Sequence, residues 1–517
     1  MSGAAEHGEH SDEAGALAAA VDGFTPVTLD GGRAGVIGSD GRIVRIGWPE
    51  LGGPMFYPTH AGEIVEGRLQ VSHDMGEAGV VVEAVDLRFD WSLDASVTAV
   101  MPYLMYGQSL AMNLGHDTSL TAGPVAPGRA LMYANAGAGA QMSVSERPGF
   151  ETHDFGPCHF PASDLDRLED LCEQRGESPV SGAVAGFLAA LPEETGVVAS
   201  NHARGGMAMR KLLPKRLAAG RGTGIQYAGL LRAMIRTRQF CDAQGRELRQ
   251  PVVSFIHGEA GHPEDDLLYG AELVALQAAL TEDLGRITGL DGVVPMFTDQ
   301  ARVVWGAVPP LGQVEPPVAV AQLRAAQAHP GRIFCVGPKY FLPRRSTRKG
   351  RGDPVHLLAE ASALWGDYHG RAIRQTLQGQ PWVPLHVASY AREGAVIRLR
   401  VEGGDGSPLM IDRETVTETR ASVLGFRWVQ EGGVGRAVGE VAVAGREIIV
   451  TLTGDPGPDF ARAALTIGFF ADMPLIDEGP LTGGRTNIRD SSPDIGRYGL
   501  PMWNWLCHDW FWEKGTG

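Results

Sequence analysis

The 517-residue chain has few cysteines, no long apolar run and no excess of positive charge. Its five cysteines are an odd number, widely spaced and without a Cys-x-x-Cys pair, which argues against a disulfide framework and a zinc ribbon. No segment approaches the roughly 18 apolar residues of a membrane span, and the acidic N-terminus is unlike a signal peptide. We therefore expect reduced thiols, no membrane span, and synthesis in the cytoplasm without a Sec signal.

The charge balance limits the partners. Lysine and arginine number 45 against 61 aspartate and glutamate, which gives a net charge of −16. So acidic a chain is disfavoured as a general nucleic-acid binder. With 44% hydrophobic residues, 70 glycines and 33 prolines, the composition is typical of a loop-rich globular protein of two or three domains.

Several common site motifs are missing. There is no G-x-S-x-G, which excludes the nucleophile elbow of the common α/β-hydrolases. Neither G-x-x-x-x-G-K-S/T nor G-x-G-x-x-G occurs, which disfavours a nucleotide-binding enzyme. The segment His257-Gly258-Glu259 matches half of a zinc-deaminase signature, but the Pro-Cys-x-x-Cys half is missing. We predict no metal and no cofactor.

Composition and periodicity divide the chain into four predicted parts. Residues 1–20 are typical of a flexible tail, and 21–95, with short apolar runs between glycine-rich turns, of a small N-terminal β module. From 96 to 380 apolar strands alternate with amphipathic helices, which predicts a parallel sheet covered by helices. About 130–190 is too long for an ordinary connection and predicts an insertion near the site. Residues 381–517 follow a period of two, which predicts a β-sandwich-like domain.

One serine stands at the end of an apolar strand. Ser109 follows the apolar run 104–106, Gly107 and Gln108, and Asp353 and His356 lie three residues apart before a predicted helix. A serine, a histidine base and an orienting carboxylate are the groups of a serine hydrolase. The alternative for Ser109 is a structural serine that caps the following helix.

Four separated segments between about 98 and 375 resemble the SGNH (GDSL-like) hydrolases, within them the sialate O-acetylesterases and related carbohydrate acetylesterases. The first segment, Gly107-Gln108-Ser109, is similar to the family's Gly-Gln-Ser-Asn but has Leu110 in place of Asn, and the second is the strand 197–200 leading to Gly205-Gly206. The third, His257-Gly258-Glu259-Ala260-Gly261, is similar to Gln-Gly-Glu-Ser followed by Asn or Asp. The fourth, Asp353-Pro354-Val355-His356, is similar to the closing Asp-x-x-His.

The resemblance implies a fold and a mechanism. The fold is a flavodoxin-like, three-layer α/β/α domain, here flanked by all-β modules. Ser109 is the implied nucleophile, His356 the base and Asp353 the residue that orients it, in an esterase that removes O-acetyl groups from a carbohydrate. Backbone N–H groups of Ser109 and of Gly206 or Gly205 are the implied oxyanion hole.

The third segment departs from the family pattern. His257 replaces the Gln and Gly261 the Asn or Asp, so a side-chain oxyanion donor is either missing or supplied by His257 or His262. Loss of one such donor costs roughly a hundred- to a thousandfold in rate. Glu259 has two interpretations, a buried carboxylate that ties strand to helix, which we favour, and a polar group of the site; Gln108 is a further candidate for substrate binding.

Basic residues gather just before Asp353, and tryptophans at the end of the chain. Arg344 and Arg345 begin a basic run that either is a solvated loop or clamps an anionic glycan. The last fifteen residues hold four tryptophans, which either fill a core or form an exposed sugar platform.

A second function class stays open. The absence of a signal peptide and the altered third segment allow a glycan- or capsule-binding spike, tail or receptor-binding protein of a phage-like particle, with the hydrolase fold active or degenerate. The expected partner in both cases is a carbohydrate, acetylated where the chain is an enzyme. A homo-oligomer or a released particle is a further expectation of the second class.

Overall fold

The computed structural model describes residues 93–112, 119–133, 167–174, 176–217, 225–259, 268–301, 317–345, 353–418, 421–469, 480 and 483–516, together with six strands before residue 93. Those strands form two three-stranded antiparallel sheets, β1(Thr25–Thr28), β2(Ala34–Ile37) and β3(Ile43–Arg45), and β4(Glu63–Val65), β5(Arg68–Asp74) and β6(Val80–Asp86). The strand content agrees with the predicted N-terminal β module. The predicted tail 1–20 lies outside the described residues.

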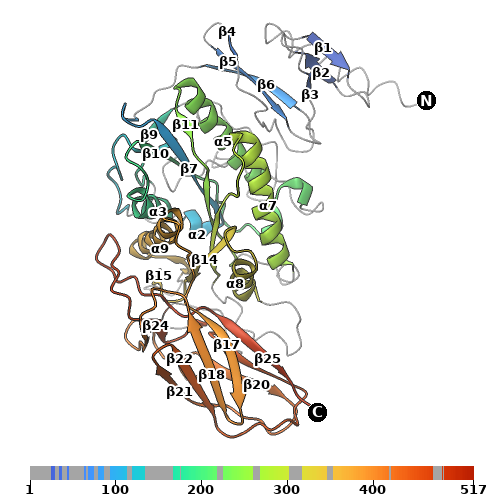
Figure 1. The fold of residues 1–517 in the computed structure, drawn as a ribbon, viewed down its shortest axis with the longest axis vertical. Coiled ribbons are helices and arrows are strands. Elements are labelled where there is room, and N and C mark those ends of the chain that lie inside the picture. Colours follow the sequence, from blue (N-terminus) through green and yellow to red (C-terminus); the bar gives the residue numbers. More distant parts are fainter. Residues whose placement is uncertain are drawn as a thin grey trace, which may run out of the picture.

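An eight-stranded sheet forms the centre of the molecule (Figure 1). Its strands are β7(Ala99–Gly107), β8(Ala130–Tyr133), β9(Leu168–Asp170), β10(Thr195–Asn201), β11(Glu247–Leu248), β12(Val252–Ile256), β13(Met296–Gln300) and β14(Ile333–Pro338). They lie in the order β14-β13-β12-β7-β10-β8-β9, β11 also pairs with β7, and every pair but β8–β9 is parallel. Counted along the chain, β7, β10, β12, β13 and β14 have the flavodoxin-like order 2-1-3-4-5.

Helices cover both faces of this sheet. Every residue of β7 is buried, and its side chains alternate: Leu104 and Tyr106 enter one hydrophobic core, Tyr103 and Met105 the other. Figure 1 shows α3(Pro179–Leu188) and α9(Ala359–Leu377) on one side, and α5(Ile225–Ala243), α7(Tyr269–Thr288) and α8(Val318–Ala328) on the other. The predicted α/β/α domain is confirmed.

Glycines let α3 and α9 pack backbone to backbone. A Cβ on Gly182 would lie 2.8 Å from the Cα of Gly366, and one on Gly186 would lie 2.9 Å from the Cα of Gly370. No side chain fits at such a crossing, so the four-residue spacing of small residues fixes how α9 lies on the domain. The strand that carries His356 leads directly into α9, so this packing also restrains the segment of His356.

The C-terminal part is all β, as predicted. One sheet is β17(His386–Glu393), β18(Val396–Glu402), β22(Glu447–Leu452) and β21(Val438–Ala444); a second is β20(Phe426–Glu431), β23(Arg462–Ile467) and β25(Asp509–Lys514); and β19(Leu409–Ile411) pairs with β24(Ile488–Asp490). Side chains from the first two sheets share one hydrophobic core, with Ile397 and Leu399 from one and Phe426 and Leu465 from the other. The sheets therefore pack as a sandwich.

The segment 130–190 differs from the predicted insertion. Its first residues are β8, a strand of the central sheet, β9 pairs with β8, and α3 covers the sheet. These elements belong to the layered domain itself, and 134–166 lie outside the described residues. No helix within the described ranges is both long and apolar enough to cross a membrane.

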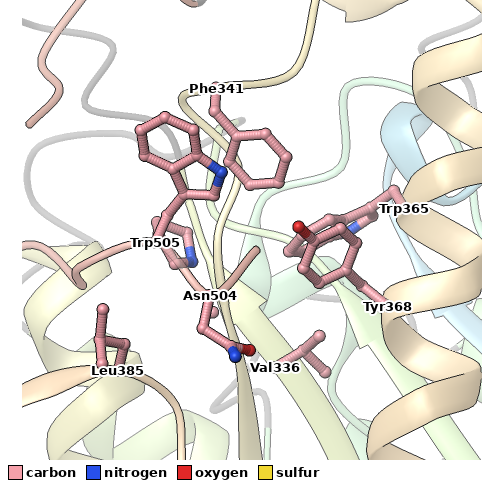
Figure 2. A pocket seen from close by; sticks show the side chains of 9 residues that line it. Val336, Phe341, Trp365, Tyr368, Leu385, Asn504 and Trp505 are labelled. Atoms are coloured by element: carbon pink, nitrogen blue, oxygen red, sulfur yellow. The ribbon is translucent and has the colours of Figure 1, made fainter. Parts of the chain in front are cut away.

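The last residues of the chain join the two folded parts. Trp505, 2% exposed, stacks on Phe341 of the α/β domain with ring centroids 5.3 Å apart, and the hydroxyl of Tyr340 donates to the carbonyl of Leu506. Of the two roles predicted for the four tryptophans, the core role is confirmed for Trp505 and Trp510, which are buried, while Trp503 and Trp512 are half-buried. Figure 2 shows Trp505 and Phe341 beside Trp365 at a cavity of about 10 Å³, large enough for about one water molecule and too small for a sugar.

Candidate active site

Ser109 lies where the central strand ends. It is the first residue of the short helix α2(Ser109–Met112), two residues after the last residue of β7, and it is half-buried while the residues around it are buried. The turn requires Gly107, which has φ of 129°, and a Cβ there would lie 2.0 Å from the carbonyl oxygen of Ile256. The sequence around the serine thus brings the strand end against its neighbour β12.

The strands on either side of β7 hold its end in place. The backbone N–H of Gln108 donates to the carbonyl of Ile256 (3.0 Å) in β12, and the N–H of Arg204, after β10, donates to the carbonyl of Gly107 (3.0 Å). Because β10 and β12 follow β7 in the chain but flank it in the sheet, this is the topological switch point. Open α/β sheets bind their ligands in the crevice outside the carboxyl ends of the strands at that point.

The two glycines predicted for the oxyanion hole follow β10. A Cβ on Gly205 would lie 3.7 Å from the Cβ of Ser109, so Gly205 is beside the serine, with Gly206 next to it in the chain. Gly206 has φ of 68°, the left-handed conformation that favours glycine. The buried side chain of Asn201 braces this loop: its Nδ2 donates to the carbonyl of Ala111 and its Oδ1 accepts from the backbone N–H of Ala203.

Asn201 was missed by the sequence reasoning. Its only signal is a polar residue at the end of an apolar strand, which does not distinguish a brace from an ordinary strand end.

The predicted base reaches the same place on a separate hairpin. β15(Arg344–Arg345) pairs with β16(Asp353–Leu357), and α2 lies against β16. The structure therefore brings the segment of His356 to the segment of Ser109, and the His356 side chain is half-buried. Asp353 is the first residue of β16; its side chain lies outside what the structure describes.

Two arginines predicted to bind substrate have different surroundings. Arg344 is 3% exposed, and its guanidinium donates to the carbonyls of Val355 (2.8 Å) and Lys339 (3.2 Å). Substrate binding by Arg344 is therefore not supported, because its fork-shaped head is turned onto backbone inside the protein. Arg345 is half-buried in β15.

The third motif segment is buried behind the site. His257 has no exposed surface, and its ring nitrogens contact the carbonyl of Met207 (2.8 Å) and the hydroxyl of Tyr269 (3.1 Å). Burial lowers the pKa of His257 to about 4, so the ring is neutral at pH 7. Both nitrogens already have partners, which leaves His257 out of the site that we propose. Gly261 and His262 lie outside the described residues.

Gln108 and Glu259 meet in the interior. The Nε2 of Gln108 donates to Oε2 of Glu259 (2.5 Å), and Lys339 Nζ lies 3.0 Å from the other carboxylate oxygen. Gln108 is 1% exposed and the Glu259 side chain 2%, which favours the structural interpretation of Glu259 and leaves neither facing a substrate. The sequence reasoning did not single out Lys339, which has no motif around it.

A second carboxylate, that of Asp299, forms an ion pair with Lys339. Lys339 Nζ also donates to Oδ1 of Asp299 (3.0 Å), while the indole N–H of Trp365 donates to Oδ2 (2.8 Å). Burial alone would raise the pKa of Asp299, but the charge of Lys339, with a further contribution from His369 3.9 Å away, outweighs it and holds this pKa below its usual value. The lysine therefore sits between two carboxyl groups, those of Glu259 and Asp299.

Within the ranges that the structure describes, no group of three His, Cys, Asp or Glu side chains is placed to hold a metal ion. Beside the end of β7 lie the hydroxyl of Ser109, backbone N–H groups and the strand that carries His356.

No family model and no curated protein matches this sequence. Among solved structures, a carbohydrate acetylesterase from Xanthomonas citri is similar with a TM-score of 0.46 at 13% identity, over 94% of this chain and 92% of its own. A protein from Arabidopsis thaliana has a TM-score of 0.32 at 15% identity, over 53% of this chain and 96% of its own. A carbohydrate acetylesterase from Sinorhizobium meliloti has a TM-score of 0.25 at 11% identity, over 54% and 99%.

Likenesses this weak say nothing about activity. The strand order defines the class of fold, a doubly wound α/β domain, and Ser109 lies at its switch point. With β modules on either side, this is the architecture that the SGNH resemblance implies.

Proposed function

We propose that the protein is a serine esterase. The observation that carries the proposal is the meeting, at the switch point, of three segments far apart in sequence: Ser109 after β7, the loop after β10 in which a Cβ on Gly205 would lie 3.7 Å from the Cβ of Ser109, and β16 with His356 against α2. A structural capping serine needs none of these neighbours.

The proposed reaction is acyl transfer in two steps. His356 takes the proton of the Ser109 hydroxyl as Oγ attacks the ester carbonyl carbon, and the alcohol leaves with that proton. Water then attacks the acyl-enzyme and gives a proton to His356, which passes it to Oγ of Ser109 as acetic acid leaves and ionises to acetate. Asp353 orients the imidazole in this proposal.

Backbone groups form the proposed oxyanion hole. The N–H groups of Ser109 and of Gly206 or Gly205 are the donors, and a glycine permits the close approach that a Cβ would block. With His257 engaged elsewhere, no described side chain of the third segment adds a donor. We therefore propose that the enzyme has a kcat roughly a hundred- to a thousandfold lower than one whose oxyanion hole also has a side-chain donor.

The proposed substrate is an O-acetylated carbohydrate. This choice rests on the resemblance of the four sequence segments to carbohydrate acetylesterases, and it is narrower than the site chemistry alone requires, because the same fold supports several kinds of ester hydrolysis. The alternative remains a glycan-binding protein of a particle, in which the same crevice binds without turnover.

One experiment separates the two. Acetate release is measured from O-acetylated sialic acid, acetylated xylan and bacterial capsule, with wild type, Ser109→Ala and His356→Ala. Ser407→Ala and His329→Ala, in the β domain and at the end of α8, are matched controls. The proposal expects each site variant to lose on the order of 10⁴-fold in rate while the controls keep theirs. Glycan binding without acetate release by wild type would instead support the binding protein.

A further inference from the structure

A chain of buried polar side chains connects the nucleophile segment to the base segment. It consists of Gln108, Glu259, Lys339 and Arg344, which we name the polar bridge. Its first half starts one residue before Ser109: the Gln108 amide donates to one carboxylate oxygen of Glu259, and Lys339 Nζ lies 3.0 Å from the other. The Lys339 side chain is fully buried and that of Glu259 is 2% exposed.

The second half of the polar bridge ends one residue before His356. Arg344 donates through one nitrogen to the carbonyl of Lys339 (3.2 Å) and through another to the carbonyl of Val355 (2.8 Å). One planar guanidinium thus connects the lysine's own backbone to the strand of the base. Its five donors in a rigid fork restrain two acceptors at once, which a single ammonium cannot do in the same geometry.

The hairpin pairs β16 with a short strand. β15 has two residues, and the register between Arg344 and Arg345 is irregular. Directional, charge-assisted bonds between buried side chains add restraint to this short ladder. The lysine is also tied to α9, which follows β16, because its second carboxylate, Asp299, accepts from Trp365 in that helix.

From this geometry we infer that Arg344 is a positioning residue, which through the polar bridge fixes the place of His356 relative to Ser109. The inference rests on the proposed function. Arg344 acts through the backbone: its bond to the carbonyl of Val355, the residue before His356, sets where the base strand lies. Since a displacement of about 1 Å in a reacting group costs about a hundredfold in rate, loss of the fork should lower kcat and leave KM nearly unchanged.

The test compares Arg344→Met and Arg344→Lys with a matched buried arginine. Arg485 is 2% exposed and, like Arg344, donates to two backbone carbonyls, those of Thr417 and Gly483, but in the β domain. Kinetics use 4-nitrophenyl acetate and the acetylated glycan hydrolysed by wild type, and thermal unfolding shows that each variant is folded.

The expected result is a drop in kcat of about a hundredfold for Arg344→Met with KM within about threefold of wild type, and a smaller drop for Arg344→Lys. Arg485→Met keeps the wild-type kcat. In the background of His356→Ala, Arg344→Met costs no more than about twofold further, since residues that act as one unit are not additive. If Arg344→Met does not fold, Arg344→Lys and its double variant decide the question.

Three results would overturn the inference: an unchanged kcat in folded Arg344→Met, an equal loss in Arg485→Met, or a full additional loss on top of His356→Ala. Failure of the proposed function gives a different result: wild type itself releases acetate no faster than Ser109→Ala. In that case the inference about Arg344 fails as well.

Discussion

Glu173 carries a carboxyl group that the fold buries. It precedes α3, and its Oε1 accepts from the hydroxyl of Ser178 (2.8 Å) and from the backbone N–H of Ser181 (3.3 Å), while its Oε2 has no hydrogen-bond partner among the described residues. Burial, and then the charge of the nearby Glu177, raise the pKa of Glu173 from 4.5 to about 8. The folded protein thus holds this group protonated at neutral pH.

The sign of the stability effect follows from that shift. Between about pH 4.5 and pH 8 the folded state keeps a proton on Glu173 that the unfolded state has lost, so the free energy of unfolding falls as the pH rises through this window. Each pKa unit corresponds to about 1.4 kcal/mol, which puts the largest effect at roughly 5 kcal/mol. Glu173→Gln removes the ionisation but keeps an acceptor oxygen for Ser178 and Ser181.

The assay is urea unfolding of wild type and Glu173→Gln from pH 5 to pH 8.5, with Glu194→Gln, an exposed carboxyl, as the control. We expect the two proteins to be about equally stable at pH 5, and the variant to be more stable by a few kcal/mol at pH 8.5. The control difference should stay flat. A Glu173→Gln variant whose difference from wild type does not change with pH, or grows toward acid, would refute the reasoning.

Three further substitutions test the packing described above. Gly107→Ala places a methyl 2.0 Å from the carbonyl oxygen of Ile256 at a φ of 129°, so we expect at least about 2 kcal/mol of destabilisation by thermal unfolding, together with loss of acetate release. Arg324→Met removes the partner 2.6 Å from Asp509, whose pKa burial raises to about 6; the loss of Tm should be larger at pH 8 than at pH 5. Trp505→Ala empties a 2%-exposed site and should cost about 3–5 kcal/mol in urea unfolding.

The architecture was accessible from the sequence because its signals are local. The strands and helices between 96 and 380 carry their own patterns, such as the apolar run of β12 and the leucines that recur at helical spacing in α7, and this alternation predicted the covered parallel sheet. Ser109 followed from its place after an apolar strand and a glycine. The short strand β8 has no such signal, since four residues do not establish a period, and the segment 130–190 was therefore predicted to be an insertion instead of part of the sheet.

The interior of the site was not accessible in the same way. Lys339, Asp299 and Glu259 come from the ends of three different strands and meet only after the sheet has formed. Arg344 begins a basic run, which in sequence favours solvent or a glycan, and only the tertiary structure supplies the two carbonyls that bury it. Polar burial depends on partners distant in sequence, and one sequence does not show them.

The central claim, that Ser109 is a nucleophile activated by His356, is tested most directly by covalent labelling. Wild type, Ser109→Ala and His356→Ala are treated with a fluorophosphonate, and the modified peptide is identified by mass spectrometry. The account predicts one phosphonate on Ser109 in wild type, none in Ser109→Ala, and labelling at least about a hundredfold slower in His356→Ala. A wild type that releases acetate while Ser109 stays unlabelled and another residue carries the phosphonate would contradict it.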